Sequence, residues 1–305
     1  MRGGAVCRAG LALLAILAWA PLTARAAGPT ALPATSFGAS FVHLTTAGNS
    51  AGAATFLDHP ALNDNPGAMV FVTVNAGGDG LQHSSPIAVR YDSAAARWAI
   101  VNQDGAAMPA GVRFNVLAAG SDSGSFLHVA TLANSNLAWT YLDHPQTNDN
   151  PNALILATPR DAGVANRHNI ATWYSEYSHK WAIVNQDLAV MPAGAAFNVL
   201  VVNGSAGALM HRANLANILG SATFFRQRRA TGNPLALVFI TACYNPGGGQ
   251  GTYNDHPIGV DYVLTLGTYF WSVANQDNAP INSGAAFSVL VLGARADMPL
   301  MLRRR

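Results

Sequence analysis

The feature of the sequence that most constrains the fold is a threefold internal repeat with fixed spacings. Its copies open with "FVHLTTAGNS" at Phe41, "FLHVATLANS" at Phe126 and "LMHRANLANI" at Leu209. In each copy an Asn-Pro pair begins 22 positions after the opening histidine. The motifs "RWAIVNQD", "KWAIVNQD" and "FWSVANQD" follow, and ten positions separate the aspartate of each from the phenylalanine of "FNVL" or "FSVL". Such constant spacings predict three copies of one structural unit.

The residue pattern within each copy predicts β-structure. Short apolar or alternating runs such as "AMVFVTV" and "RFNVLAA" are separated by Asn, Asp, Gly and Pro, and helical periodicity is lacking beyond the first thirty residues. We therefore predict an all-β protein of three tandem antiparallel repeats, sandwich-like or barrel-like, of about 85 residues and about six strands each. The repeats span 38–120, 124–203 and 207–294. Their short joins predict close packing, either as separate units or as one pseudo-threefold body.

The two ends of the chain differ from the repeats. Residues 1–26 combine Arg2 and Arg8, an apolar run from 11 to 22 and small residues at Ala24 and Ala26, which predicts a secretory signal. That run is too short to cross a membrane, and no later stretch is long enough. We expect a secreted or periplasmic protein without a membrane span, ending in a solvated basic tail over 295–305.

Composition excludes several classes of protein. Of 305 residues, 50% are hydrophobic and 10% charged, which is typical of a packed globular chain. The formal charge of +2 becomes −1 when the three arginines of the signal are removed, so no nucleic-acid partner is predicted. Cys243 is the one cysteine of the mature chain, which excludes an intramolecular disulfide, and its apolar surroundings predict a buried, inert thiol.

The most constant motifs favour structural roles. The Asn-Gln-Asp that ends each tryptophan strand carries amide and carboxylate groups suited to bonding turn backbone. A sugar site built from this tryptophan and the polar triplet is the alternative. His43, His128 and His211, in the openings, have apolar neighbours, which is typical of half-buried strand residues.

The motif Asp-His-Pro varies between copies. It occurs in "LDHPALNDNP" and "LDHPQTNDNP", whereas the third copy has Arg226-Gln227-Arg228 there and keeps the Asn-Pro pair. The third copy instead carries "NDHPIGV", aligned with "HSSPIAV" and "RHNIATW". The positions of these histidines differ between copies while the other motifs are kept, which indicates surface sites that differ from repeat to repeat. The candidate ligand-binding residues are Asp58, His59, Asp143, His144, Asn254, Asp255 and His256.

Motifs for catalysis and for metal binding are lacking in the sequence. It contains no nucleophile elbow, zinc-binding helix, phosphate-binding loop with lysine, or paired-cysteine site. "NDNP" has oxygen ligands but lacks the length and the distal glutamate of a calcium loop, so we predict no metal and no cofactor. If the protein is an enzyme, the candidate general bases are His59, His144, and His256 with Asp255.

The motifs "LDHPQTNDNPNA", "NDHPIGV", "WAIVNQD" and "MPAGAAFNVL" resemble a tandem-repeat family of exported bacterial proteins. The resemblance covers nearly the whole mature chain, and the missing Asp-His-Pro of the third copy departs from it. It implies export and repetition, and it implies no catalytic residue.

These observations lead to three hypotheses. The first is a secreted multivalent binding protein for a glycan or another surface polymer, because repetition gives avidity to weak sites. The second is a secreted hydrolase or lyase with a histidine general base. The third is a structural surface or matrix protein.

Overall fold

The computed structural model describes residues 37–77, 80–120, 123–265 and 267–293. The predicted signal and basic tail lie outside these residues, as does Cys7. In the described part of the chain, no helix has the length and apolar character of a membrane crossing.

The described residues form 21 strands, seven in each repeat where about six were expected, and no α-helix. Repeat 1 contains β1 (Ala39–Leu44), β2 (Ser50–Ala51), β3 (Ala54–Phe56), β4 (Met69–Asn75), β5 (Ile87–Asp92), β6 (Arg97–Asn102) and β7 (Arg113–Ala119). Repeat 2 contains β8 (Ser125–Val129), β9 (Ser135–Asn136), β10 (Trp139–Tyr141), β11 (Ile155–Arg160), β12 (Ile170–Ser175), β13 (Lys180–Asn185) and β14 (Ala196–Val201). Repeat 3 contains β15 (Ala208–Arg212), β16 (Ile218–Leu219), β17 (Ala222–Phe224), β18 (Leu237–Cys243), β19 (Ile258–Thr265), β20 (Thr268–Asn275) and β21 (Ala286–Leu292).

Each repeat is sandwich-like, but its two layers belong to two different sheets. The three seven-stranded sheets have the orders β2-β3-β6-β5-β11-β14-β8, β9-β10-β13-β12-β18-β21-β15 and β16-β17-β20-β19-β4-β7-β1. Every sheet therefore joins four strands of one repeat to three strands of another. The predicted all-β fold of three repeats is confirmed, in the sandwich-like form.

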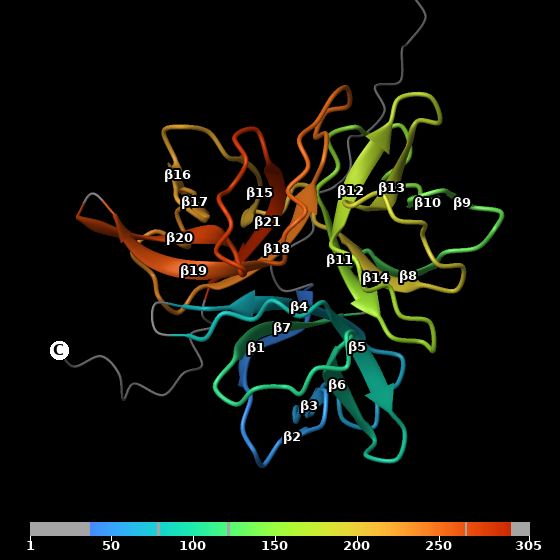
Figure 1. The fold of residues 1–305 in the computed structure, drawn as a ribbon, viewed down its shortest axis with the longest axis vertical. Helices are drawn as coiled ribbons and strands as arrows, with labels where there is room; N and C mark the ends of the chain where they lie inside the picture. The colour runs from blue at the N-terminus through green and yellow to red at the C-terminus, as the bar shows by residue number, and fades with distance from the viewer. Residues whose placement is uncertain (1–36, 78–79, 121–122, 266, 294–305) are drawn as a thin grey trace, which may run out of the picture.

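One parallel strand pair closes each junction between repeats. Strand β5 pairs with β11, β12 with β18, and β19 with β4, while the other pairs are antiparallel. The predicted antiparallel pairing within each repeat is confirmed, and the parallel pairs occur only between repeats. Because the third pairing returns to repeat 1, the three repeats form one closed pseudo-threefold body, with β4, β11 and β18 nearest its axis (Figure 1).

A tryptophan lies at the centre of each repeat core. Trp98, Trp181 and Trp271 are at most 2% exposed. Each donates its Nε1–H to the carbonyl oxygen of the asparagine in the Asn-Pro pair, at 2.8, 2.7 and 2.9 Å. This bond explains why both motifs recur in every copy, since it satisfies the buried indole donor and fixes the turn.

A fourth apolar cluster lies between the repeats. Its members come from all three: Phe37, Phe71, Leu117, Leu156, Leu200, Val202, Leu237, Phe239, Leu290 and Leu292. Hydrogen bonds between repeats accompany it. The Asn115 and Asn198 amides donate to the carbonyl oxygens of Val238 and Val70, both of which belong to a different repeat, at 2.8 and 2.9 Å. The apolar core at the centre of the molecule is thus formed by residues from all three repeats.

Candidate functional site

The asparagine of each Asn-Gln-Asp motif fixes the loop that precedes the neighbouring strand of its own repeat. Asn185 and Asn275 accept bonds at Oδ1 from the amides of Asn166 and Asn254, at 2.8 and 2.7 Å. At the equivalent place in repeat 1, the oxygen of Asn102 accepts from His83 Nε2 at 2.8 Å.

The glutamine of the motif links one repeat to the next. Gln103 accepts from the backbone N–H of Asn166 at 2.9 Å and donates to its carbonyl at 2.8 Å. Gln186 and Gln276 accept in the same way from the backbone N–H of Asn254 and of His83. The three glutamines are at most 8% exposed. The amide of each motif asparagine also donates to the carbonyl oxygen four residues on. The first two residues of the motif therefore hold backbone in place, as predicted from the sequence.

Replacing Gln103 by alanine should lower the free energy of unfolding by about 2 kcal/mol, because two buried backbone groups lose their partner. Urea denaturation followed by tryptophan fluorescence measures the change. The control is Gln146→Ala, at an exposed position, for which we expect a change within about 0.5 kcal/mol. Equal effects in the two variants would contradict a linking role for Gln103.

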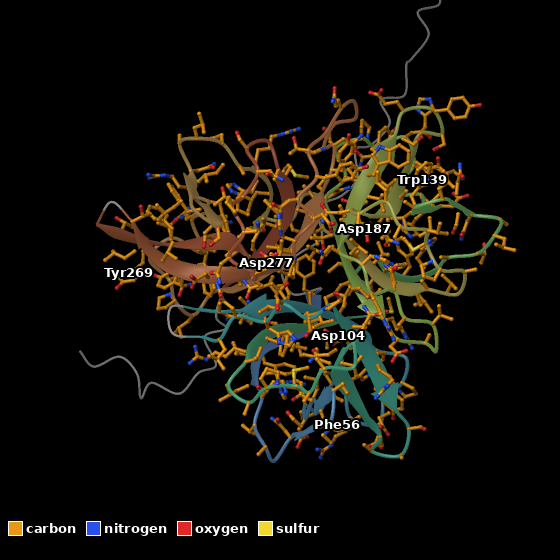
Figure 2. The ribbon with its side chains drawn as sticks, in the orientation of Figure 1. Phe56, Asp104, Trp139, Asp187, Tyr269 and Asp277 are labelled. Carbon is orange, nitrogen blue, oxygen red and sulfur yellow. The ribbon has the colours of Figure 1, made fainter. Side chains whose placement is uncertain are left out.

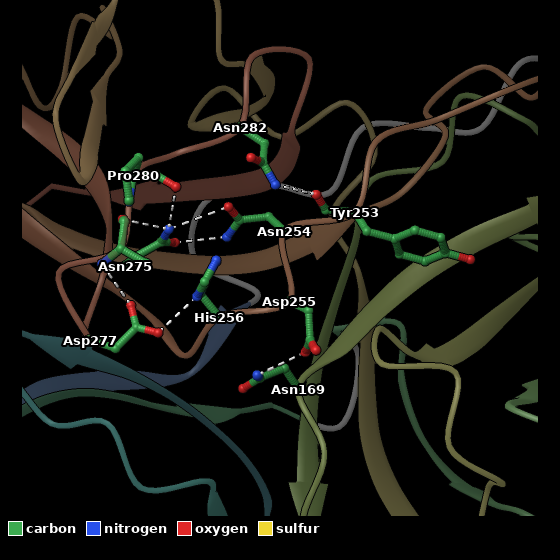
Figure 3. Close-up of polar contacts among 10 residues, drawn as sticks. Asn169, Tyr253, Asn254, Asp255, His256, Asn275, Asp277, Pro280 and Asn282 are labelled. Carbon is green, nitrogen blue, oxygen red and sulfur yellow. Dashed lines mark hydrogen bonds and ion pairs between the residues drawn. The ribbon is translucent and has the colours of Figure 1, made fainter.

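The aspartate of the motif has a different environment. One carboxylate oxygen of Asp104, Asp187 and Asp277 accepts from a backbone N–H two residues on, at 2.9 to 3.0 Å. The other oxygen of Asp187 accepts from His168 Nδ1 at 2.6 Å, and that of Asp277 from His256 Nδ1 at 2.8 Å. The three aspartates lie near the axis (Figure 2), and the His256 pair is seen in Figure 3.

These two histidines line a cavity on the axis, which we call the axial pocket. Its volume is about 110 Å³. All three repeats contribute to it: Val72, Thr73, Val74, His83, Ser85, Pro86, Ile87, Gln103, Ala157, Pro159, His168, Asn169, Ile170, Ile240, Thr241, Ala242, His256, Pro257 and Ile258. A mostly apolar cavity with a few convergent polar groups is the usual form of a small-ligand site.

The first residues of strands β5, β12 and β19 show which histidines are equivalent in the three repeats. Ile87, Ile170 and Ile258 begin equivalent strands, so Ser85, His168 and His256 occupy equivalent positions two residues earlier. His83 corresponds instead to Asn166 and Asn254. Aligning "RHNIATW" with "NDHPIGV" from their first residues is therefore wrong by one residue, because copy 2 has no proline to mark the strand start.

The three candidate residues of "NDHPIGV" have different roles, and only His256 lines the axial pocket. Asn254 is 2% exposed and bonds Gln186 and Asn275, so it supports the loop. Asp255 is exposed and accepts from the Asn169 amide at 3.0 Å (Figure 3). The carboxylate that holds His256 is that of Asp277 and not that of its sequence neighbour, since adjacent residues point to opposite sides of an extended chain.

His59 and His144 lie away from the axial pocket, on repeats 1 and 2. They stack on Phe41 and Phe126, with ring centroids 4.6 and 4.3 Å apart. The Nδ1 of each accepts a backbone N–H, from Ala61 in one case and from Gln146 in the other. In the neutral ring the proton therefore sits on Nε2.

The aspartate beside each of these histidines pairs with a cation across the repeat. Asp58 lies 3.3 Å from Arg97, and Asp143 lies 2.6 Å from Lys180. Lys180 holds the pKa of the Asp143 carboxyl below its usual value by a hydrogen bond, to which the Asn148 amide adds another. The Asn63 amide bonds Asp58 in the same way, at 2.8 Å.

In repeat 1 this ion pair borders a groove of about 720 Å³, which we call the edge groove. Its lining consists of Phe41, Val42, His43, Leu44, Gly48, Asn49, Ser50, Ala51, Phe56, Asp58, Ala95 and Arg97. The groove lies where strand β1 ends one sheet and strand β2 ends another, so it opens at the outside of the repeat.

The histidines of the repeat openings are structural. His43, His128 and His211 bond Thr55, Thr140 and Thr223 through Nε2, at 2.7 to 2.9 Å. Each threonine hydroxyl in turn reaches the Oδ1 of an asparagine, at 2.9 to 3.2 Å. Burial lowers the pKa of all three imidazoles, to about 4 in His128 and His211.

Neither a metal centre nor a reactive thiol emerges from the described residues. No group of three or more His, Cys, Asp or Glu side chains among them could hold a metal ion. Cys243 is 1% exposed and free, and burial raises the pKa of its thiol to about 12. Such a thiol stays protonated and is a poor nucleophile.

Four residues at the axial pocket were not predicted from the sequence: Ser85 and His168, which line it, and Asp187 and Asp277, which bond its histidines. A signal was present, because His168 and His256 both lie two residues before an isoleucine that starts a strand. The aspartate of the constant triplet was interpreted as turn chemistry, which its first oxygen indeed performs.

The fold and these sites define a class of all-β proteins in which three repeats share their sheets around one axis. The chain belongs to the family of the domain of unknown function DUF7452, whose model matches residues 31–94, 88–201 and 171–291. The three matches agree with tandem repetition. No curated protein and no solved structure matches the chain.

Proposed function

We propose that the protein is an exported, non-catalytic binding protein for a glycan or another surface polymer. The observation that carries this proposal is the edge groove of repeat 1, with its Asp58–Arg97 pair and the rings of Phe41 and Phe56. A carboxylate and a guanidinium offer acceptors and donors for sugar hydroxyls. The Phe56 ring suits the apolar C–H face of a sugar, while the Phe41 ring is stacked on His59 at one border of the groove.

Repeat 2 has matching residue types at the equivalent positions. Phe126, Tyr141, Asp143 and Lys180 stand where repeat 1 has Phe41, Phe56, Asp58 and Arg97, and the aspartate–cation pair is present in both. Two similar weak sites on one rigid body bind a polymer more tightly than either alone, because the second contact is intramolecular.

Repeat 3 departs from this pattern. It retains an aromatic residue, Phe224, but Arg226 replaces the aspartate and Phe270 replaces the cation. The Arg226 guanidinium lies over the Phe270 ring, 5.0 Å from its centroid. Repeat 3 thus carries a positive charge where the other two repeats carry an ion pair, so this position suits a different segment of the ligand.

The exchange of Asp58 and Asp143 for asparagine tests the proposal. In the double variant D58N/D143N we expect retention on the bound polysaccharide to fall at least 100-fold, and about tenfold in each single variant, since both sites act together. Retention is measured by affinity electrophoresis, after a glycan array identifies the polysaccharide.

The matched control is D64N/D149N. These aspartates lie in the same two segments, are exposed, and have left-handed backbone (φ 56° and 55°) that asparagine tolerates. The control removes the same charge and should keep wild-type retention. Wild-type retention in D58N/D143N would overturn the grooves as the binding sites, and a folded protein that no glycan retains would overturn the function.

The axial histidines favour one alternative, a hydrolase with a histidine general base. Asp187 and Asp277 hold Nδ1–H of His168 and His256, which leaves Nε2 as the basic nitrogen. His59 and His144 lack this arrangement, because their Nδ1 accepts a backbone N–H. The alternative requires a substrate whose turnover is lost in the folded variants H168A and H256A and kept in H59A and H144A.

A further inference from the structure

We propose that the axial pocket is a second binding site, distinct from the edge grooves, and that it takes a small primary alkylammonium ion. The ammonium group would lie at the mouth, between Ser85, His168 and His256, with the alkyl chain directed inward along the axis.

The inner part of the pocket suits an alkyl chain. The side chains of Thr73 and Thr241 are 4% exposed, whereas those of their neighbours Val74 and Ala242 pack in the apolar cores of the repeats. The two threonine hydroxyls are already used, because Oγ1 of Thr73 accepts the Ile240 N–H and Oγ1 of Thr241 accepts the Ala157 N–H. With these hydroxyls engaged, the two threonine side chains offer their methyl groups to a ligand.

The mouth of the pocket suits an ammonium group. Ser85, His168 and His256 occupy equivalent positions in the three repeats, so the mouth offers one acceptor from each. In the neutral imidazoles Nδ1–H is directed to Asp187 or Asp277, and Nε2 is the acceptor. A primary ammonium has three N–H donors in threefold arrangement, which matches a hydroxyl oxygen and two imidazole nitrogens.

The charge around the mouth favours a cation. Asp104, Asp187 and Asp277 surround the axis (Figure 2), and Asp255 lies beside them, bonded to Asn169 (Figure 3). None of the described residues that line the pocket is a lysine or an arginine. Converging carboxylates raise the local concentration of cations and disfavour an anion of the same size.

The volume limits the ligand to a short chain. A cavity of about 110 Å³ has space for roughly four water-sized groups, at about 30 Å³ each. An alkyl chain of four carbons below the ammonium group fills it, which makes n-butylammonium the appropriate probe.

Isothermal titration at pH 8 compares four probes of similar size. We expect n-butylammonium to bind with a dissociation constant in the millimolar range or below. Tetramethylammonium, which lacks N–H donors, 1-butanol, which lacks charge, and butyrate, which has the opposite charge, should each bind at least tenfold more weakly. Equal or tighter binding of any of these three would overturn the proposal, as would a lack of heat with n-butylammonium.

Substitutions locate the site. S85A should weaken n-butylammonium binding about tenfold, and H168A/H256A should abolish it, whereas H144A on the outer side of repeat 2 should leave it unchanged. Thermal unfolding shows whether each variant is folded. If H168A/H256A is not folded, S85A alone tests whether the site lies in the axial pocket. Wild-type affinity in folded S85A and in folded H256A would refute the assignment. The same variants should keep glycan retention, which separates this site from the edge grooves.

Discussion

Acidification from pH 7 to pH 5 should lower the free energy of unfolding by about 4 kcal/mol, through His128 and His211 alone. Burial lowers the pKa of both imidazoles from 6.5 to about 4 in the folded protein. Between pH 6.5 and about pH 4 these two histidines are protonated in the unfolded chain and neutral in the folded protein. The free energy of unfolding therefore falls as pH falls. Each histidine contributes about 2 kcal/mol to the loss at pH 5, and little further loss follows below pH 4.

Urea denaturation at pH 7, 6 and 5 measures this slope. The variant H128Q/H211Q removes both groups and should have a nearly flat profile over the same interval, apart from the part due to His43 and His83, whose pKa burial also lowers. His179→Asn is the control, because this histidine side chain is 65% exposed and its left-handed backbone suits asparagine. An unchanged slope in H128Q/H211Q would contradict the assignment.

A single repeat, such as residues 124–203, should not fold alone. Its strands β11 and β12 would lose the partners β5 and β18, and its central side chains Leu156, Leu200 and Val202 would face water. Exposing three such side chains costs about 6 kcal/mol, at roughly 2 kcal/mol each. That loss is comparable to the whole stability of a small domain.

Circular dichroism and an amide correlation spectrum of the purified fragment test this expectation, with disordered spectra as the expected result. The control is the full chain cut by a protease at a site inserted near Gly204, in the join between repeats 2 and 3. The cut protein should stay assembled, because its sheets are still shared. A fragment with dispersed signals and cooperative unfolding would show that one repeat suffices.

Spacing in the sequence was enough to predict the repeat unit. The buried tryptophan and the Asn-Pro pair recur together because they bond each other within one copy. The opening histidine and its threonine, 12 residues apart in each copy, form another such local contact. Contacts within one repeat can therefore be recognised in the sequence, because the two residues recur at the same spacing in every copy.

Contacts between repeats produce no comparable residue pattern in the sequence. Both separate units and one closed body were compatible with the sequence, and the shared sheets show that the repeats form one body. Gln103 reaches Asn166 across 63 residues, and its partner there is a backbone group that any residue type supplies. For the same reason the axial pocket was not predicted, since Ser85, His168 and His256 meet only when the three repeats are closed.

Pairing of strand β19 with strand β4 has a consequence for the number of repeats. In an open array of stacked repeats, a unit can be gained or lost at either end, because each unit contacts only its neighbours. Here the first and last copies are also neighbours, and the central side chains fill the space left by three units. Duplication of one repeat would leave the added copy without a place in the ring, so the number three is fixed by geometry in this fold.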